Sequence, residues 1–219
     1  MKEYLNAQNK MNESIIENVF SSDELHRFSK SDFRWAENRK KKLRQKPVKK
    51  GEIYQFEFGK NYIPEMSYEH RGLVIGVKQK LLYVLPIFSY DPLKHLDVYH
   101  PVDYPESHSD LFLLKSSEFS FISHDSLLKL NDIRTVSINR ILYQQSGRIP
   151  PDSDTYKQIE TLTIQKYFPT FYHSYKQNLQ TIQTLSEQLQ KANMDKENLQ
   201  SENEQLKAEI ASIKEQREN

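Results

Sequence analysis

The sequence contains no cysteine, few glycines and no long apolar run. Among its 219 residues there are 0 Cys and only 5 Gly. The lack of Cys excludes disulfide frameworks, thiol nucleophiles and zinc–thiolate sites, and it is typical of a reducing compartment. So few glycines cannot build a Gly-rich phosphate loop or a dinucleotide site. Because no apolar stretch approaches the roughly 20 residues of a membrane span and the first residues are too polar for a signal peptide, we expect a cytoplasmic protein without membrane contact.

Charge is balanced over the whole chain but not along it. The 31 basic and 30 acidic side chains give a net charge of +1, which excludes a protein that coats nucleic acid by bulk charge. Residues 34–50, however, carry nine positive charges against the single negative charge of Glu37. Such a block is typical of a solvated helix face or linker, or of an arm that contacts phosphates. We therefore predict a basic linker over 34–50.

The patterning on either side of this linker predicts a chain of the α+β class. Apolar residues recur every three to five positions over 1–33, and Ser21, Ser22 and Asp23 supply an N-cap signal between two candidate helices, which indicates a helical N-terminal extension. A β-rich region follows, and Pro150 and Pro151 then introduce a helix that closes the domain at Phe168. The predicted domain is 51–168, with the apolar run 81–89 as its central strand. The predicted strands are 52–58, 73–77, 81–89, 96–102 and 127–130.

The last part of the chain has the most regular periodicity. Spacings of three and four alternate from Ile182 to Ile213 along one mostly apolar seam, which is a heptad register and predicts a coiled coil over 175–217. Lys196 and Asn203 fall at a positions with leucines at d. This combination favours two parallel strands, because a buried Asn is best tolerated opposite its own copy. We expect a parallel homodimer; the alternative is an amphipathic helix that folds back on the β domain.

Four short motifs occur in order between residues 48 and 168. They are 49–54 (KKGEIY), 70–75 (HRGLVI) with Glu65 before it, 84–89 (VLPIFS), and 126–136 (SLLKLNDIRTV) with Arg140 after it. Their order and spacing resemble the MazF and PemK family of bacterial growth-arresting toxins. The resemblance leaves the N-terminal helices and the C-terminal heptads unaccounted for.

The resemblance implies an SH3-like, strongly curved β-barrel with endoribonuclease activity. Such a toxin cleaves single-stranded RNA without a metal or cofactor and is held inactive by a cognate antitoxin. The 2′-OH attacks the adjacent phosphodiester and leaves a 2′,3′-cyclic phosphate and a 5′-OH end. The reaction needs one group that takes the 2′ proton, another that gives a proton to the leaving oxygen, and donors or positive charge that face the phosphate.

The 70–75 motif carries the first candidate catalytic residues. In the family an Arg stands five residues after the loop Glu; here that position is His70, and Arg71 is next. We expect Arg71 to stabilise the scissile phosphate and His70 to move protons. Since adjacent strand residues point to opposite faces, only one of the two is expected to face the groove. The alternative is a surface His beside an Arg that is paired with Glu65 or Glu69.

The end of the central strand carries the third candidate. The family has a hydroxyl there; this chain has Phe88, followed by Ser89. Ser89 would position the phosphate or the leaving oxygen if a bulge re-aims it, and otherwise the site is weakened or lost. Glu65 is expected to orient the catalytic groups. The predicted RNA-binding residues are Lys60, Tyr62, Lys49 and Lys50.

Two further alternatives stay open at this point. The other loop histidines, His95, His100, His108 and His124, are spaced too irregularly for a metal set, so we assign no metal and expect a bare acidic and imidazole surface between 91 and 126. Because both catalytic positions of the family carry other residues, the protein could instead be a catalytically weak or inactive binding module, similar to MazF or to the gyrase-poisoning toxin CcdB. A third hypothesis is a coiled-coil adaptor.

Overall fold

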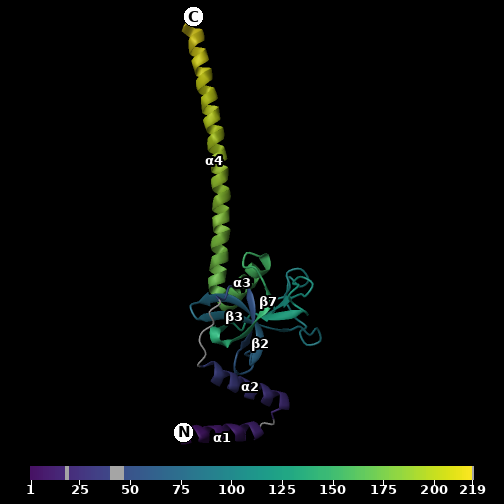
Figure 1. Ribbon diagram of the computed structural model, residues 1–219. Helices are drawn as coiled ribbons and strands as arrows, with labels where there is room; N and C mark the ends of the chain where they lie inside the picture. The colour runs from purple at the N-terminus through teal and green to yellow at the C-terminus, as the bar shows by residue number, and fades with distance from the viewer. Residues whose placement is uncertain (18–19, 40–46, 219) are drawn as a thin grey trace. The chain divides into compact units, whose positions relative to one another are not determined.

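A computed structural model describes residues 1–17, 20–39 and 47–218 of the chain. It divides into two compact units, Met1–Tyr167 and Phe168–Asn219. Within the described residues, the first unit holds helices α1 to α3 and a seven-stranded sheet, and the second holds the single helix α4 (Figure 1). The predicted basic linker falls partly outside the described residues, since 40–46 are not among them.

Two helices precede the sheet, as the N-terminal periodicity predicts. They are α1 (Lys2–Glu17) and α2 (Ser22–Asn38). Ser21 begins α2 with a capping box: its hydroxyl accepts a hydrogen bond from the Glu24 N–H at 3.3 Å, and its own N–H donates to the Glu24 carboxylate at 2.9 Å. These two bonds satisfy backbone donors that a helix start otherwise leaves unpaired. The helix continues past the predicted boundary at 33 into the basic segment.

The β-rich region forms one antiparallel sheet, so the α+β class is confirmed. Its order is β4-β5-β3-β2-β1-β7, with β6 also paired to β3. In the part of the chain that the structure describes, no strand pairing joins β4 to β7, and the sheet is open. The strands are β1 (Glu52–Glu57), β2 (Glu69–Lys78), β3 (Leu81–Ser89), β4 (Leu111–Leu114), β5 (Ser126–Lys129), β6 (Arg134–Ser137) and β7 (Ile141–Arg148).

Strand β3 is the centre of the sheet, as its apolar run predicts. It pairs with β2 along one side, and with β6 and β5 in turn along the other. Leu82 and Val84 pack into one apolar cluster, whereas Leu85 and Ile87 pack into another. The strand therefore buries both of its faces, which explains why its sequence is apolar almost throughout.

The strand predicted over 96–102 is wrong, and β4, β6 and β7 were missed. Only Tyr99 and His100 form isolated bridges in that segment. Pro101 has no backbone N–H to offer a ladder, which limits pairing there. The sequence pattern does not predict β7, because β7 is an edge strand without apolar alternation. Its centre is polar from Tyr143 to Ser146.

Two helices follow the sheet. In α3 (Asp154–Tyr167) the buried Tyr156 and Ile159 pack on the cluster that contains Leu85 and Ile87, and Ser153 caps the helix by accepting from the Tyr156 N–H at 3.2 Å. The closing helix is thus confirmed. The short 3₁₀ helix η1 (Ile138–Arg140) links β6 to β7.

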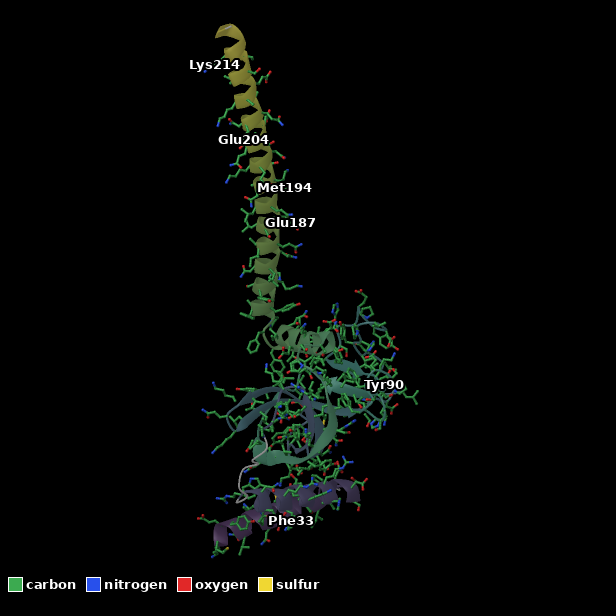
Figure 2. The ribbon with its side chains drawn as sticks, turned by 45° about the horizontal axis from the view of Figure 1, so that its top comes forward. Phe33, Tyr90, Glu187, Met194, Glu204 and Lys214 are labelled. Atoms are coloured by element: carbon green, nitrogen blue, oxygen red, sulfur yellow. The ribbon has the colours of Figure 1, made fainter. Side chains whose placement is uncertain are left out.

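The predicted C-terminal segment is one continuous helix, α4 (Pro169–Glu218). Its side chains stand out around the helix, as Glu187, Met194 and Glu204 illustrate (Figure 2). The seam leucines are exposed too: Leu199 has 63% of its surface exposed. Along the described part of the chain, no helix combines the length and apolar character that crossing a bilayer requires.

Candidate functional site

The sheet brings Arg71, Ser89 and Ser126 to one face. Arg71 of β2 lies opposite Ile87 of β3, and Ser89, two residues further along β3, lies opposite Ser126 of β5. Residues two apart on a strand share a face, and cross-strand partners do so as well. The β3–β5 pairing runs without a register shift from Ile87 to Ser89. Ser89 therefore reaches this face by regular alternation, and no bulge is needed.

His124 completes the arrangement. Its Nε2 lies 2.9 Å from the Ser89 hydroxyl and 3.4 Å from Nη2 of Arg71. The same Arg71 nitrogen donates to the Ser126 hydroxyl at 3.0 Å, and that hydroxyl donates to the backbone carbonyl of His124 at 2.9 Å. We call these four residues, Arg71, Ser89, His124 and Ser126, the Arg71 cluster. It joins a cation, an imidazole and two hydroxyls.

The contacts of His124 assign its tautomer. A guanidinium can only donate, so the Nε2 that faces Arg71 carries a lone pair. Nδ1 then carries the proton and donates to the Ser123 hydroxyl, 3.0 Å away. Ser89 in turn donates to Nε2. An imidazole nitrogen that is held as an acceptor beside a cation and a hydroxyl is placed to take a proton from a bound hydroxyl group.

The loop that carries His124 is fixed by the next residue. The Asp125 carboxylate accepts hydrogen bonds from the N–H and the hydroxyl of Ser116, at 2.8 and 2.7 Å. These bonds, the backbone bond first, lower the pKa of Asp125, so the carboxylate stays charged. The Asp125 carbonyl also accepts from the Tyr90 N–H, just past the end of β3. The residue after His124 is therefore tied both to Ser116 and to the residue that follows β3.

Arg71 has no ion-pair partner among the described residues. Burial lowers its pKa, and no carboxylate offsets that effect. Arg34 on α2 is the contrast: burial lowers its pKa too, but its bonds to Glu57 and Glu69 outweigh burial and the net shift is upward. A half-buried guanidinium whose neighbours are neutral is a place where an anion gains a charge-assisted contact.

His70 lies in different surroundings from Arg71. It lines a cavity of about 340 Å³ together with Arg27, Lys30 and Arg34 of α2. Burial lowers the pKa of His70, and the charges of Arg27 and Arg71 lower it further. The imidazole is thus held neutral. The structure brings Arg71 and Ser89 together through His124, but it does not bring His70 to them.

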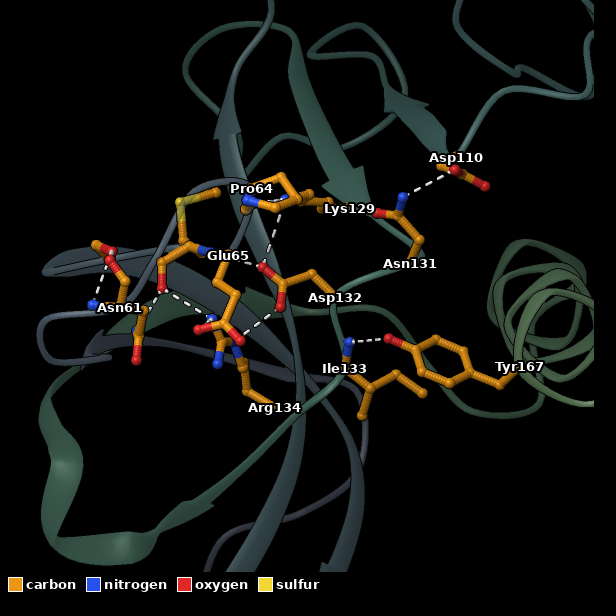
Figure 3. Close-up of polar contacts among 12 residues, drawn as sticks. Asn61, Pro64, Glu65, Asp110, Lys129, Asn131, Asp132, Ile133, Arg134 and Tyr167 are labelled. Atoms are coloured by element: carbon orange, nitrogen blue, oxygen red, sulfur yellow. Dashed lines mark hydrogen bonds and ion pairs between the residues drawn. The ribbon is translucent and has the colours of Figure 1, made fainter.

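Glu65 is engaged elsewhere. Its carboxylate lies 3.3 Å from Nη2 of Arg134, and Nε of Arg134 lies 2.8 Å from the buried Asp132 (Figure 3). Asp132 also accepts from the Met66 N–H at 2.7 Å. This network fastens the β1–β2 loop to the β5–β6 connection. It gives Glu65, Asp132 and Arg134 a structural part, separate from the Arg71 cluster.

The predicted RNA-binding residues do not form one surface. Lys60 is paired with Asp32 of α2 at 2.6 Å and lies over the Phe28 ring. Lys50 is paired with Glu160 of α3 at 3.3 Å. Lys49 stands before β1, where its backbone N–H donates to Glu52. Tyr62, on the β1–β2 loop, is the aromatic residue among these four, and with 89% of its surface exposed it can stack on a base.

Sequence reasoning missed His124 and Ser126 as site residues. The signal was the run 123–126 (SHDS), which sets two hydroxyls and an imidazole immediately before the predicted strand 127–130. The run becomes a candidate site only through the pairing of β5 with β3, which places Ser126 opposite Ser89.

No family model matches the chain, and no curated protein matches its sequence. In the ranges that the structure describes, no three His, Asp or Glu side chains gather in a way that could hold a metal ion. The Arg71 cluster itself offers one cation, one imidazole and two hydroxyls.

Proposed function

We propose that the chain is a MazF- or PemK-like endoribonuclease that cleaves single-stranded RNA at the Arg71 cluster. One observation carries the proposal: a half-buried guanidinium without a carboxylate partner in the described residues points at the same imidazole nitrogen that a serine hydroxyl contacts. Phosphate is the anion that this guanidinium suits, because it accepts several charge-assisted hydrogen bonds at once. The order of the sequence motifs supplies the kind of substrate.

The proposed reaction uses the hydroxyl of the RNA itself. Nε2 of His124 takes the proton from the 2′-OH, whose oxygen forms a bond to the adjacent phosphorus. Arg71 and Ser126 stabilise the charge that develops on the non-bridging oxygens. The bond from phosphorus to the 5′ oxygen breaks, and Ser89 passes the proton from His124 to that oxygen. The products are a 2′,3′-cyclic phosphate and a 5′-OH end, and the reaction calls for neither a metal nor a cofactor.

We also propose that this open sheet corresponds to the strongly curved, SH3-like barrel of this family. Strand β3 supports this, because it pairs with β6 along Leu81 to Val84 and with β5 along Ile87 to Ser89. A strand that serves two neighbours in succession on one side has to bend between them, and Pro86 stands at that point. A register shift in the β2–β3 pairing between Val74 and Gly76 adds to the curvature.

Two protein partners belong to the proposal. The first is a cognate antitoxin, which follows from the family resemblance. The second is another copy of this chain, joined in parallel along the α4 seam. Leu185, Leu199 and Leu206 each expose more than half of their surface on α4, and Asn203 would face its own copy. Burial of such leucines drives helix pairing, and a paired Asn sets the register.

Cleavage of RNA in the presence of EDTA tests the proposed function. The full chain is incubated with a mixed-sequence RNA, and new 5′-OH ends are counted after labelling. We expect cleavage by the unaltered protein and its loss in Arg71→Ala. Arg148→Ala is the control, because this Arg also lies on the sheet but its side chain bonds the Lys50 carbonyl, away from the Arg71 cluster. Intact RNA with the unaltered protein would reject the enzyme and favour the non-catalytic binding module.

A further inference from the structure

A second polar cavity lies between α2 and the region around the end of β1 and η1. It measures about 500 Å³. Its lining includes the indole of Trp35, the amides of Asn38 and Asn139, and the guanidinium groups of Arg39 and Arg140. None of these residues belongs to the Arg71 cluster, and the N-terminal extension supplies one wall. The cavity therefore exists only because α2 packs beside the sheet.

The cations of this cavity differ in how far they are neutralised. Lys60 is paired with Asp32, and Arg34 with Glu57 and Glu69. Arg140 instead donates to the backbone carbonyl of Glu57 at 2.9 Å, and within the described residues it has no carboxylate partner. Arg39, like Arg140, has no carboxylate partner within the described residues, so both guanidinium groups keep a charge that an anion can meet.

The position of Arg140 is built into the backbone. Gly59 has a φ of +88°, and a Cβ at that residue would meet Nη1 of Arg140 at 3.0 Å. Because Gly59 has no side chain, the Arg140 guanidinium can occupy that space. The backbone of Gly59 also has a conformation that residues with a side chain rarely adopt. The guanidinium is thereby held at the wall of the cavity, where it also bonds the Glu57 carbonyl.

Trp35 gives the cavity an aromatic surface. Its side chain is 63% exposed, and the Arg39 guanidinium lies over its ring, 5.6 Å from the centroid. An exposed indole under an arginine is a stacking platform: a nucleobase has a π-face of its own and can stack on either group. Neighbouring amides can pair with the edge of a base, and free guanidinium groups with its phosphate.

We propose that this cavity binds one nucleotide of a single-stranded RNA, with the base stacked on Trp35 and the phosphate on Arg140 and Arg39. Asn38 and Asn139 contact the edge of the base. The inference rests on the proposed function, since the same strand would supply the scissile phosphate to the Arg71 cluster. It goes beyond it in assigning a binding role to the N-terminal extension, which the family resemblance leaves unaccounted for.

Tryptophan fluorescence of the full chain tests the proposal directly. The sequence contains 1 Trp, so the whole signal reports on Trp35. The probe is a short 2′-O-methyl oligoadenylate, which cannot be cleaved by 2′-OH attack, and an abasic oligomer of the same length is the comparison. We expect quenching by the oligoadenylate but not by the abasic oligomer, because stacking needs the base. Unchanged fluorescence at concentrations where a labelled oligoadenylate binds would overturn the site.

Variants then separate stacking from charge, with binding read from the anisotropy of the labelled oligoadenylate. We expect Trp35→Ala to weaken binding roughly 5- to 100-fold and Trp35→Phe to weaken it less. Phe33→Ala is the matched control, since Phe33 is equally exposed on α2 but does not line the cavity (Figure 2). Arg140→Gln should reduce affinity and its salt dependence, whereas Arg148→Gln should leave both unchanged. Equal affinities for Trp35→Ala and the unaltered chain would contradict the site.

The two proposals fail in distinguishable ways. RNA cleavage together with unquenched Trp35 would reject the cavity as a nucleotide site and leave the endoribonuclease intact. Quenching of Trp35 without any cleavage would support the cavity as an RNA site of a non-catalytic protein. Neither quenching nor cleavage would reject both.

Discussion

The hydroxyl of Ser89 lies 2.9 Å from Nε2 of His124, although the two residues are 35 positions apart in the chain. Ser89 ends the central strand, and His124 stands just before β5, which pairs with that strand. Arg71 on β2 approaches the same nitrogen, so β2, β3 and the residues at the start of β5 together position this group of side chains.

Replacement of His124 should remove most of the RNA cleavage. A positioned base contributes about 10²- to 10⁴-fold to such a reaction, so we expect His124→Ala to fall within that range. His70→Ala should keep most of the activity, because His70 lies among the α2 side chains. Initial rates on one RNA substrate compare the two. His108→Ala, at an exposed loop position, is the control; a larger loss in His70→Ala than in His124→Ala would contradict the assignment.

Arg71→Met should separate function from stability. The guanidinium is half-buried with no carboxylate partner in the described residues, so its removal relieves a desolvation cost while losing two hydrogen bonds. We expect cleavage to be lost and the free energy of unfolding to change by less than about 1 kcal/mol. Urea denaturation measures the latter. A stability loss several times larger would mean that Arg71 holds the sheet together.

Unlike Arg71→Met, Arg34→Met should destabilise the folded chain. It leaves Glu57, which is 5% exposed, without the cation that lies 3.0 Å away. A buried charge stripped of its partner costs about 3 kcal/mol or more. We expect the free energy of unfolding, measured by urea denaturation, to fall by about that amount. Lys30→Met is the matched control: the Lys30 side chain is exposed where it meets Glu69, and ion pairs of exposed cations contribute less than about 1 kcal/mol. Equal losses of stability in Arg34→Met and Lys30→Met would show that Arg34 is not needed to neutralise the buried Glu57.

The stability of the folded chain should fall as the pH drops below 6.5. The pKa of His70 is lowered from 6.5, chiefly by burial, so the unfolded chain binds a proton there before the folded chain does. The contribution of His70 is therefore complete above pH 6.5 and is lost as the pH falls toward its lowered pKa. We expect a shallower decline between pH 6.5 and about 5 in His70→Gln, measured by thermal melts. Identical slopes would show that His70 is not desolvated.

The α4 seam should hold two copies of the chain together. Leu199→Glu places a charge at a d position, where it would face its own copy, and we expect sedimentation to give a monomer. Glu187→Gln lies outside the seam and should leave the sedimenting mass that of a dimer. Asn203→Leu should make the assembly more stable but less restricted to two chains, because Asn at an a position fixes the oligomeric state at a cost in stability. A monomeric unaltered protein would reject the parallel dimer.

Several elements could be predicted because their signals are local. Ser21 and Glu24 mark the start of α2 within four residues, Tyr156 and Ile159 give α3 its apolar stripe, and the α4 heptads need no partner to be recognised. Strand β3 was identified for a similar reason, since burial on both faces leaves an apolar run. The polar edge strand β7 and the short strand β4 carry no comparable pattern, and pairing with neighbours is what makes them strands.

The candidate site was predictable only in part. The order of the motifs pointed to Arg71 and Ser89. Alternation along a strand implied that the side chains of His70 and Arg71 point to opposite faces of the sheet. The sequence could not distinguish His124 from the other loop histidines, because its contacts with Ser89 and Arg71 depend on which strand pairs with β5.

By itself, then, the sequence determined the α+β class, the helices at both ends, the central strand and the absence of thiol chemistry, since each follows from composition or from a period of a few residues. The tertiary structure alone decided which side chains meet. The pairing of β5 with β3 carries His124 to Ser89 and Arg71, and the packing of α2 beside the sheet encloses the cavity at Trp35. Contacts between distant residues arise from strand register and helix packing, which no local pattern encodes.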